Sequence, residues 1–254
     1  MKPPPNAKNG ARFHVPETLG PGAERDLPDA AGHHATRVLR LGIGDPVVLF
    51  DGNGGEHDAV ITRIHRNEVA VRVTGFRDVD RESPLGITLV QGISSGDRMD
   101  ITLRKAVELG VGAIVPVATE RSVVKLRDER ADRRRQHWQA LAVAACEQCG
   151  RNTVPPVAEP ADFRTWLAAL PKDPGTQTRI ALAVGGEASL AGLPKPDGDV
   201  LLLVGPEGGL SPEETALAVT RGFTPVRMGP RILRTETAAV VAMAAMQTLW
   251  GDLQ

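Results

Sequence analysis

Two hydrophobic patterns divide the chain near residue 80. Between residues 37 and 75, short β-branched runs are separated by the turn sequences GD, DGNGG and RN, and Val69, Val71 and Val73 alternate with other residues. A period of two turns one face of a strand inward, and closely spaced turns connect neighbouring strands. The pattern therefore predicts a small antiparallel β barrel or sandwich in this half.

Strands and helices alternate after residue 84. Continuous apolar runs predict strands, and patterns with helical spacing predict the helices between them. This alternation is typical of an α/β fold with a parallel sheet covered on both faces. The charged segment RDVDRESP, residues 77–84, is predicted to link the two halves. The expected strands are 87–93, 113–119, 179–186 and 199–206, and the expected helices are 97–110, 128–149 and 238–249.

Composition narrows the class of protein. With 254 residues, 41% of them hydrophobic, and a formal net charge of -1, the chain is expected to be globular, without a global charge that favours a polyanion. No apolar run approaches the ~20 residues that cross a bilayer, and the first residues do not resemble a secretion signal. We therefore expect a cytoplasmic protein with no membrane partner. Cys146 and Cys149 lack further metal ligands nearby, so we expect structural thiols and no metal.

Positive charge is concentrated on the predicted helix 128–149 and just before it. Arg127, Arg130, Arg134 and His137 recur every three or four residues and share one side, while apolar residues share another. Two interpretations remain open, a solvated helix face and a surface for nucleic acid. Aromatic residues make up only 3% of the chain and Tyr is absent, so we do not expect a single strand to be bound by a row of stacked rings.

Two glycine-containing loops in the last quarter of the chain carry candidate chemistry. LLLVGPEGGLSPEE occupies residues 201–214 and MGPRILRTETAAVVAM occupies residues 228–243. Each runs from an apolar strand into a helix, and such loops meet at the carboxyl edge of a parallel sheet, where ligands bind. Ser211 and Glu214 predict a capping box, and Thr235 is predicted to cap the last helix. The two loops are therefore predicted to enclose one ligand.

The first loop indicates the class of that ligand. It lacks the Lys and Ser/Thr that end a P-loop, and it does not have the glycine spacing of a dinucleotide fold. Glu207 would repel a triphosphate but would tolerate a positive centre, such as the sulfonium of S-adenosylmethionine. Gly205, Gly208 and Gly209 allow close approach of the backbone to a ligand. The alternative that these glycines only turn a corner stays open.

Several segments together resemble one family. They are, in chain order, HHATRVLRLGIGD, KAVELGV, ERSVVK, AACEQCGRN, GPEGGLS and GPRILRTETA. In this order and at these separations they resemble the bacterial RsmE family, the 16S ribosomal RNA (uracil-1498 N3)-methyltransferases. The resemblance implies a PUA-like RNA-binding β-barrel domain at residues 12–76, the linker 77–84, and a SPOUT methyltransferase domain at residues 85–254 with a parallel sheet and a trefoil knot. It leaves out the Pro-rich lead 1–11, which we expect to be disordered.

The resemblance also implies a cofactor and partners. S-adenosylmethionine is expected in the knot between the two loops, and 16S ribosomal RNA in the assembled small subunit is the expected substrate. A homodimer is expected, and the Ala-rich last helix is a reasonable part of its interface. The expected cofactor contacts are Val204, Gly205, Pro206, Glu207, Gly208, Gly209, Met228, Gly229, Ile232, Leu233, Arg234 and Thr237. The expected RNA contacts are Arg12, His33, Arg37, Arg40, Lys125 and Arg151.

The chemistry of this reaction assigns roles within the site. The N3 of a neutral uracil carries a proton; a base could accept it, and a cation could stabilise the charge that develops on O2 and O4. Glu236 or Glu207 is the candidate base and Arg234 the candidate stabiliser, so Arg234 and Glu236 are the expected catalytic residues. The alternative that these Glu residues only cap backbone N–H groups stays open. Two other functions stay open: a catalytically silent RNA-binding assembly factor, and, less favoured, a nucleotide-binding enzyme with GPEGG as its phosphate loop.

Overall fold

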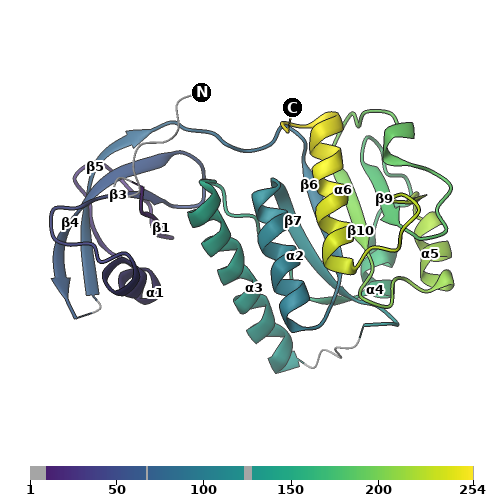
Figure 1. Cartoon of the computed structure of the whole chain (residues 1–254), viewed down its shortest axis with the longest axis horizontal. Coiled ribbons are helices and arrows are strands. Elements are labelled where there is room, and N and C mark those ends of the chain that lie inside the picture. The colour runs from purple at the N-terminus through teal and green to yellow at the C-terminus, as the bar shows by residue number, and fades with distance from the viewer. Residues whose placement is uncertain (1–9, 67, 123–127, 254) are drawn as a thin grey trace. The chain divides into compact units, whose positions relative to one another are not determined.

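The chain forms two compact units (Figure 1). The computed structural model describes residues 10–66, 68–122 and 128–253. The first unit comprises residues 1–82 and 146–154, and the second comprises residues 83–145 and 155–254. The predicted linker separates the two units at residues 82 and 83. The segment 146–154, which lies far beyond the linker in sequence, nevertheless belongs to the first unit. The predicted disorder of the lead falls mostly on residues that lie outside the described ones.

A five-stranded sheet forms the first unit. The β1–β3 pair is parallel and the other pairs are antiparallel, so the antiparallel prediction is confirmed with one exception. The strand order is β1-β3-β4-β5-β2. A short helix and a π-helical turn follow β2. The elements are β1 (Arg12–His14), β2 (Glu24–Asp26), α1 (Asp29–His33), η1 (His34–Val38), β3 (Pro46–Phe50), β4 (Glu56–His65) and β5 (Glu68–Arg77).

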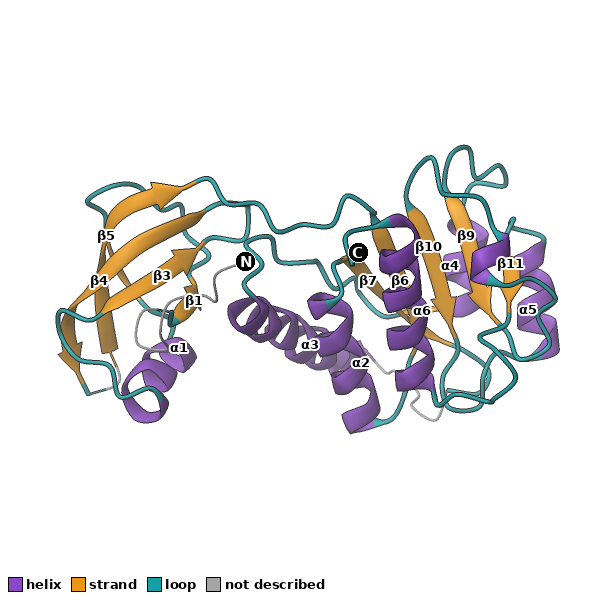
Figure 2. Ribbon diagram, turned by 45° about the horizontal axis from the view of Figure 1, so that its top comes forward, coloured by secondary structure: helices purple, strands orange, loops and turns teal. Residues whose placement is uncertain are grey.

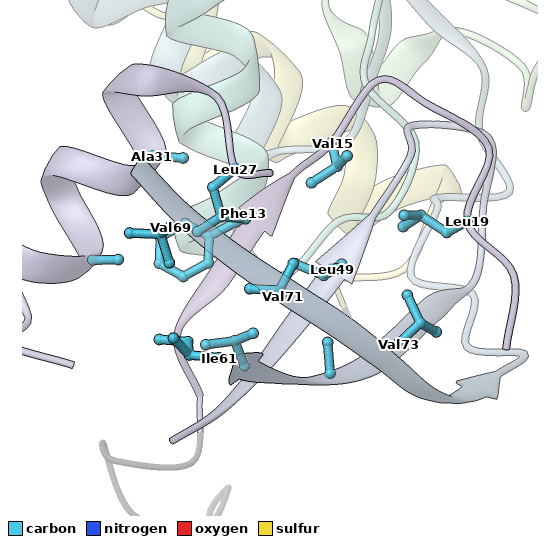
Figure 3. Packing of buried hydrophobic residues seen from close by; sticks show 13 residues of the cluster. Phe13, Val15, Leu19, Leu27, Ala31, Leu49, Ile61, Val69, Val71 and Val73 are labelled. Carbon is cyan, nitrogen blue, oxygen red and sulfur yellow. The ribbon is translucent and has the colours of Figure 1, made fainter. Parts of the chain in front are cut away.

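The core of the first unit confirms the predicted alternation. Val69, Val71 and Val73 of β5 are each at most 1% exposed, and they pack with Phe13 of β1 and Leu49 of β3 (Figure 3). Burying such side chains contributes roughly 1.5–3 kcal/mol each to the free energy of folding. The unit therefore has a hydrophobic core of its own.

The second unit is an α/β layer structure, as predicted. Its six strands are all parallel, in the order β11-β9-β10-β6-β7-β8. Helices α4 and α5 pack their apolar side chains on one face of the sheet, and α2 and α6 lie together on the other (Figure 2). The strands are β6 (Ile87–Gly92), β7 (Val111–Ala118), β8 (Ala161–Asp162), β9 (Thr178–Leu182), β10 (Val200–Val204) and β11 (Thr224–Val226). The helices are α2 (Gly96–Glu108), α3 (Asp128–Cys149), α4 (Phe163–Ala169), η2 (Leu190–Gly192), α5 (Pro212–Val219) and α6 (Thr235–Trp250).

Most predicted element ends agree with the structure to within a few residues. Helix α3 has the predicted bounds, and Trp138, Ala142 and Ala145 on its apolar side are buried. Strand β9 ends four residues before the predicted end, at Leu182. Among the described helices, none has the length and apolar character that a membrane span requires.

The predicted cap of the last helix is wrong. Helix α6 begins at Thr235, its N-cap is Arg234, and no side chain caps it. The Thr235 hydroxyl donates instead to the carbonyl oxygen of Gly205 at 2.7 Å, in the other loop. The Thr235 hydroxyl thus makes a long-range hydrogen bond and does not cap α6, although the local capping rule had predicted that it would.

Candidate functional site

A cavity of about 410 Å³ opens where three parallel strands end. Leu182, Val204 and Val226 are the last residues of β9, β10 and β11, which are neighbours in the sheet (Figure 2), and all three line the cavity. The two glycine loops supply most of the remaining wall. Ligands of open parallel sheets bind at this carboxyl edge because the loops there converge. The predicted meeting of the two loops over one space is confirmed.

Ten of the twelve residues that were expected to contact a cofactor line this one cavity. Arg234 and Thr237 do not line it; both are exposed at the start of α6. The structure adds a third segment, residues 182–184, which follows β9. The carboxyl-edge rule would have found this segment if the end of β9 had been predicted correctly. The ten residues are Val204, Gly205, Pro206, Glu207, Gly208, Gly209, Met228, Gly229, Ile232 and Leu233.

The first loop is folded tightly on itself. A Cβ atom on Gly205 would lie 2.7 Å from the carbonyl carbon of Gly209 and from the Leu210 nitrogen, so only glycine fits there. Past the loop, the Ser211 hydroxyl accepts from the Glu214 N–H and the Glu214 carboxylate accepts from the Ser211 N–H, which confirms the predicted capping box. The loop is therefore shaped by its own backbone and held by the helix that follows.

Glu207 is anchored to helix α2. Its Oε1 accepts hydrogen bonds from the Ser95 hydroxyl at 2.6 Å, the Ser95 N–H at 2.9 Å and the Arg98 guanidinium at 2.9 Å. Burial opposes ionisation, but these hydrogen bonds outweigh it and lower the pKa of Glu207 to about 2. A carboxylate with so low a pKa is a weak base near neutral pH. The candidate base of the first loop is thus better suited to fixing the loop than to accepting a proton.

A buried amide connects the roots of the two loops. The Gln91 Nε2 donates to the Thr235 hydroxyl at 3.1 Å and to the Gly205 carbonyl oxygen at 3.4 Å. The Thr235 hydroxyl donates in turn to the same carbonyl oxygen. Gln91 ends the apolar part of β6, where the sequence pattern gave no reason to single it out. The hydrogen bonds between these three residues hold the first loop against the start of α6.

The two residues expected to be catalytic have different surroundings. Glu236 points one oxygen toward Arg98, at 4.0 Å, while its Oε2 is buried and finds no hydrogen-bond partner among the described residues. Arg234 is exposed and pairs with no described acidic group. Arg98, which the sequence analysis missed, thus contacts both candidate carboxylates. Arg121 is also at the site, because its guanidinium donates to the Gly208 carbonyl oxygen at 2.9 Å.

Comparisons with known proteins agree with this arrangement. A family model described as an RNA methyltransferase domain matches residues 81–247, and a model described as an RNA methyltransferase PUA domain matches residues 27–74. The ribosomal RNA small subunit methyltransferase E of Buchnera aphidicola subsp. Acyrthosiphon pisum is 31% identical over 96% of this chain and 95% of its own. The chain belongs to the ribosomal RNA small subunit methyltransferase E family.

Solved structures of this family superpose on nearly the whole chain. The methyltransferase E of Neisseria gonorrhoeae, solved bound to S-adenosylmethionine, is 44% identical with a TM-score of 0.88, over 96% of this chain and 99% of its own. A Legionella pneumophila protein, solved with the same bound cofactor, is 38% identical with a TM-score of 0.90 over the same shares. The fold is therefore that of methyltransferase E, with a PUA-type first domain.

The expected RNA contacts of this family member fall into two groups. His33, Arg37 and Arg40 are exposed on and after the helical turns that follow β2. Arg12 and Arg151, by contrast, turn into the first unit. Lys125 lies outside the described residues, as does Arg127 of the basic helix stripe, and the side chain of Arg130 is not described either.

Arg12 and Arg151 are held by a buried polar cluster. Arg12 donates to the carboxylate of Glu56 and to the side-chain oxygen of Asn152, and Arg151 pairs with Glu82. Burial opposes ionisation of Glu56, but hydrogen bonds from Arg81 and Arg12 outweigh it and lower the pKa of that carboxyl. These arginines tie the segment 146–154 into the first unit, and their contact with RNA stays a prediction.

Cys146 of this segment differs from reactive thiols in its surroundings. Cys146 is fully buried, and burial raises the pKa of its thiol to about 12. Its Sγ lies 3.6 Å from the Thr153 carbonyl oxygen. Within the described ranges no cluster of three or more His, Cys, Asp or Glu has a metal-binding arrangement. Cys146 is thus a structural thiol.

Proposed function

We propose that the chain is an S-adenosylmethionine-dependent methyltransferase that methylates N3 of one uridine in the 16S ribosomal RNA of the small subunit. The observation that carries the proposal is the single cavity lined by ten of the expected cofactor contacts. Relatives solved with S-adenosylmethionine and the methyltransferase E names of similar proteins support it. The assignment of uracil N3 as the atom that receives the methyl group rests on the family resemblance.

The cavity suits this cofactor chemically. Its volume lies in the range of ~300–1,000 Å³ typical of small-molecule sites. Its wall combines apolar side chains with the glycine backbone, which suits an adenosyl group held by main-chain N–H and C=O groups. Glu207, whose pKa is lowered to about 2, places one negative charge on this wall, beside which the sulfonium of the cofactor could lie. Bound S-adenosylmethionine would supply the electrophilic methyl group.

The residues of this chain would activate and position the uracil. The N3–H bond must break, and we propose the Glu236 carboxylate as the group that takes the proton. Its buried Oε2 has no partner among the described residues, whereas the Oε1 of Glu207 accepts hydrogen bonds from Ser95 and Arg98. Arg234, exposed at the start of the same helix, would stabilise the negative charge on the uracil oxygens.

The two units would have different tasks, RNA binding in the first and methyl transfer in the second. We propose residues 12–76 as an RNA-binding domain, residues 85–254 as the methyltransferase domain, and residues 77–84 as the linker. The exposed His33, Arg37 and Arg40 remain the proposed RNA contacts of the first domain. We further propose a trefoil knot in the second domain, a homodimer formed through α6, and action in the cytoplasm on the assembled small subunit. Exposed Val241 and Leu249 on α6 support the dimer.

A substitution tests the role of Glu236. In methylation of small subunits from cells that lack the enzyme, Glu236→Gln should lower kcat about 10²–10⁴-fold, the usual contribution of a general base. Raising the pH should restore part of the rate, because the N3 proton then leaves without a base. Glu213→Gln, on an exposed Glu of α5, is the matched control and should retain full activity. Unchanged kcat in Glu236→Gln would remove Glu236 from the mechanism.

Ligand and substrate are tested separately. S-adenosylmethionine or S-adenosylhomocysteine should raise the thermal midpoint of the protein, whereas stabilisation by ATP alone would contradict the proposal. Mass mapping of ribosomal RNA should show the loss of one 3-methyluridine in cells without the protein. Stabilisation by the cofactor with no change in any modified uridine would reject the uracil assignment and keep the methyltransferase.

A further inference from the structure

The second cavity loop, between β11 and α6, carries three arginines without any acidic residue between them. Arg227, Arg231 and Arg234, in the sequence RMGPRILR, are all exposed, and we call them the arginine row. No ion pair or side-chain hydrogen bond joins any of them to the rest of the described chain. By contrast, Arg164 of the same unit pairs with Glu213 at 3.1 Å. The guanidinium groups of the row are therefore free to bind an external anion.

The carboxylates at the site do not neutralise the row. Glu236 follows it in sequence but points toward Arg98, at 4.0 Å. Glu207, across the cavity wall, receives its hydrogen bonds from Ser95 and Arg98. The row thus adds uncompensated positive charge to one side of the cavity in a chain whose formal net charge is only -1.

The loop that carries the row is fixed only at its ends. The Arg227 N–H donates to the Ala188 carbonyl oxygen at 3.0 Å, and the Ala238 N–H donates to the Arg234 carbonyl oxygen at 2.8 Å as α6 begins. Between these points, residues 228–233 make no backbone hydrogen bond to other described residues. A segment with so few hydrogen bonds can adjust at low cost to a ligand.

We infer that Arg227 and Arg231 of the arginine row bind the phosphate backbone of the RNA strand that presents its base to the cavity, while Arg234 keeps the role at the uracil oxygens proposed above. The inference rests on the proposed function and adds an RNA surface on the methyltransferase domain. Arg227 and Arg231 themselves line the cavity, so a base that enters it brings its flanking phosphates to the row. A guanidinium binds phosphate through two parallel hydrogen bonds, and such contacts position a strand without reading its sequence.

Salt dependence of RNA binding tests the row. The variants are Arg227→Gln, Arg231→Gln and the double variant, and the probe is a labelled single-stranded fragment of 16S ribosomal RNA around the target uridine, titrated at several KCl concentrations. Each lost phosphate contact should reduce the slope of log affinity against log salt by about 0.7 and lower the affinity at low salt several-fold. The KM for small subunits should rise more than kcat falls.

Lys195→Gln is the matched control. Lys195 is exposed and precedes β10, so it lies at the amino edge of the sheet, away from the cavity. This variant should keep the wild-type salt slope. In calorimetry with S-adenosylmethionine alone, the Kd of the Arg227→Gln and Arg231→Gln variants should change by a smaller factor than their affinity for RNA at low salt.

Two results would overturn the inference. An unchanged salt slope in the double variant would show that the row does not contact RNA. Loss of S-adenosylmethionine affinity without a change in the slope would assign the arginines to the carboxylate of the cofactor. Failure of the proposed function would give a different result. The wild-type protein would then neither bind S-adenosylmethionine nor transfer a methyl group, while the salt dependence of RNA binding would still show whether the arginine row contacts RNA.

Discussion

Replacing Thr235 by valine should loosen the cavity at the point where its two loops meet. The Thr235 hydroxyl is buried, donates to the Gly205 carbonyl oxygen at 2.7 Å and accepts from the Gln91 Nε2 at 3.1 Å. Valine has nearly the same shape, so the substitution removes the two hydrogen bonds without opening a large cavity. The effect therefore isolates the polar link between the first loop and α6.

The expected loss follows from the groups that stay behind. A typical internal hydrogen bond contributes about 0.5–1.5 kcal/mol, and a buried group left without a partner costs about 1–3 kcal/mol. The Gly205 carbonyl oxygen keeps a longer hydrogen bond of 3.4 Å from Gln91, which limits the penalty. We expect the free energy of unfolding to fall by about 1–3 kcal/mol, which lowers the thermal midpoint by roughly 2–10 °C at this chain length.

Thermal unfolding and cofactor calorimetry together provide the assay. Because the Thr235 link fixes the first loop, the affinity of the Thr235→Val variant for S-adenosylmethionine should also fall, by about 3–30-fold if 0.7–2 kcal/mol of the loss appears in binding. Thr248→Val is the control, since the Thr248 hydroxyl is exposed and donates only to a carbonyl of its own helix, at 2.9 Å. A Thr235→Val protein with both wild-type stability and wild-type affinity would refute the reasoning.

Three further predictions follow, two on the second unit and one on Cys146 of the first unit. Gly205→Ala should abolish cofactor binding because its Cβ would collide with the loop backbone, whereas Gly96→Ala, with open space around it, should not; equal Kd values by calorimetry would contradict this. The pKa of Glu207 is lowered from 4.5 to about 2, so its stabilising effect is present above pH 4.5 and is lost as the pH falls toward 2. Arg98→Gln should shrink that acid-dependent loss in urea titrations, and an identical pH profile would argue against the pairing. Cys146, with a pKa near 12, should resist a thiol reagent at pH 8 until the protein unfolds, and rapid labelling of both thiols would disprove its burial.

Features with a local cause were predictable from the sequence. The capping box of Ser211 and Glu214 lies within four residues, and the bounds of α3 follow from its continuous helical spacing. The meeting of the two loops was predictable as well, because parallel strands end at one edge whatever their order in the sheet. Ten of the expected cofactor contacts could be placed in one cavity on that rule and the family resemblance.

Features that depend on distant partners were not predictable. Arg12 was expected to contact RNA because it is a basic residue in a β domain, but Glu56, 44 residues away, accepts its guanidinium inside the first unit. Gln91 gave no signal because it sits in an apolar strand, and its role depends on Gly205, 114 residues away. A sequence pattern shows which residues are polar, but it does not show which polar side chains form hydrogen bonds with each other in the fold.

Arg98 explains why two similar carboxylates at one site can take different roles. Its guanidinium lies 2.9 Å from Glu207 but 4.0 Å from Glu236, so the strong hydrogen bond goes to the first loop and only a weak electrostatic contact goes to α6. Glu207 is thereby kept ionised and immobile, while Glu236 retains a buried oxygen with no described partner. Acid–base sites commonly hold two ionisable groups whose surroundings separate their tasks. On this basis Glu207 is the structural anchor of the cofactor loop, and Glu236 is the carboxylate that we propose as the base.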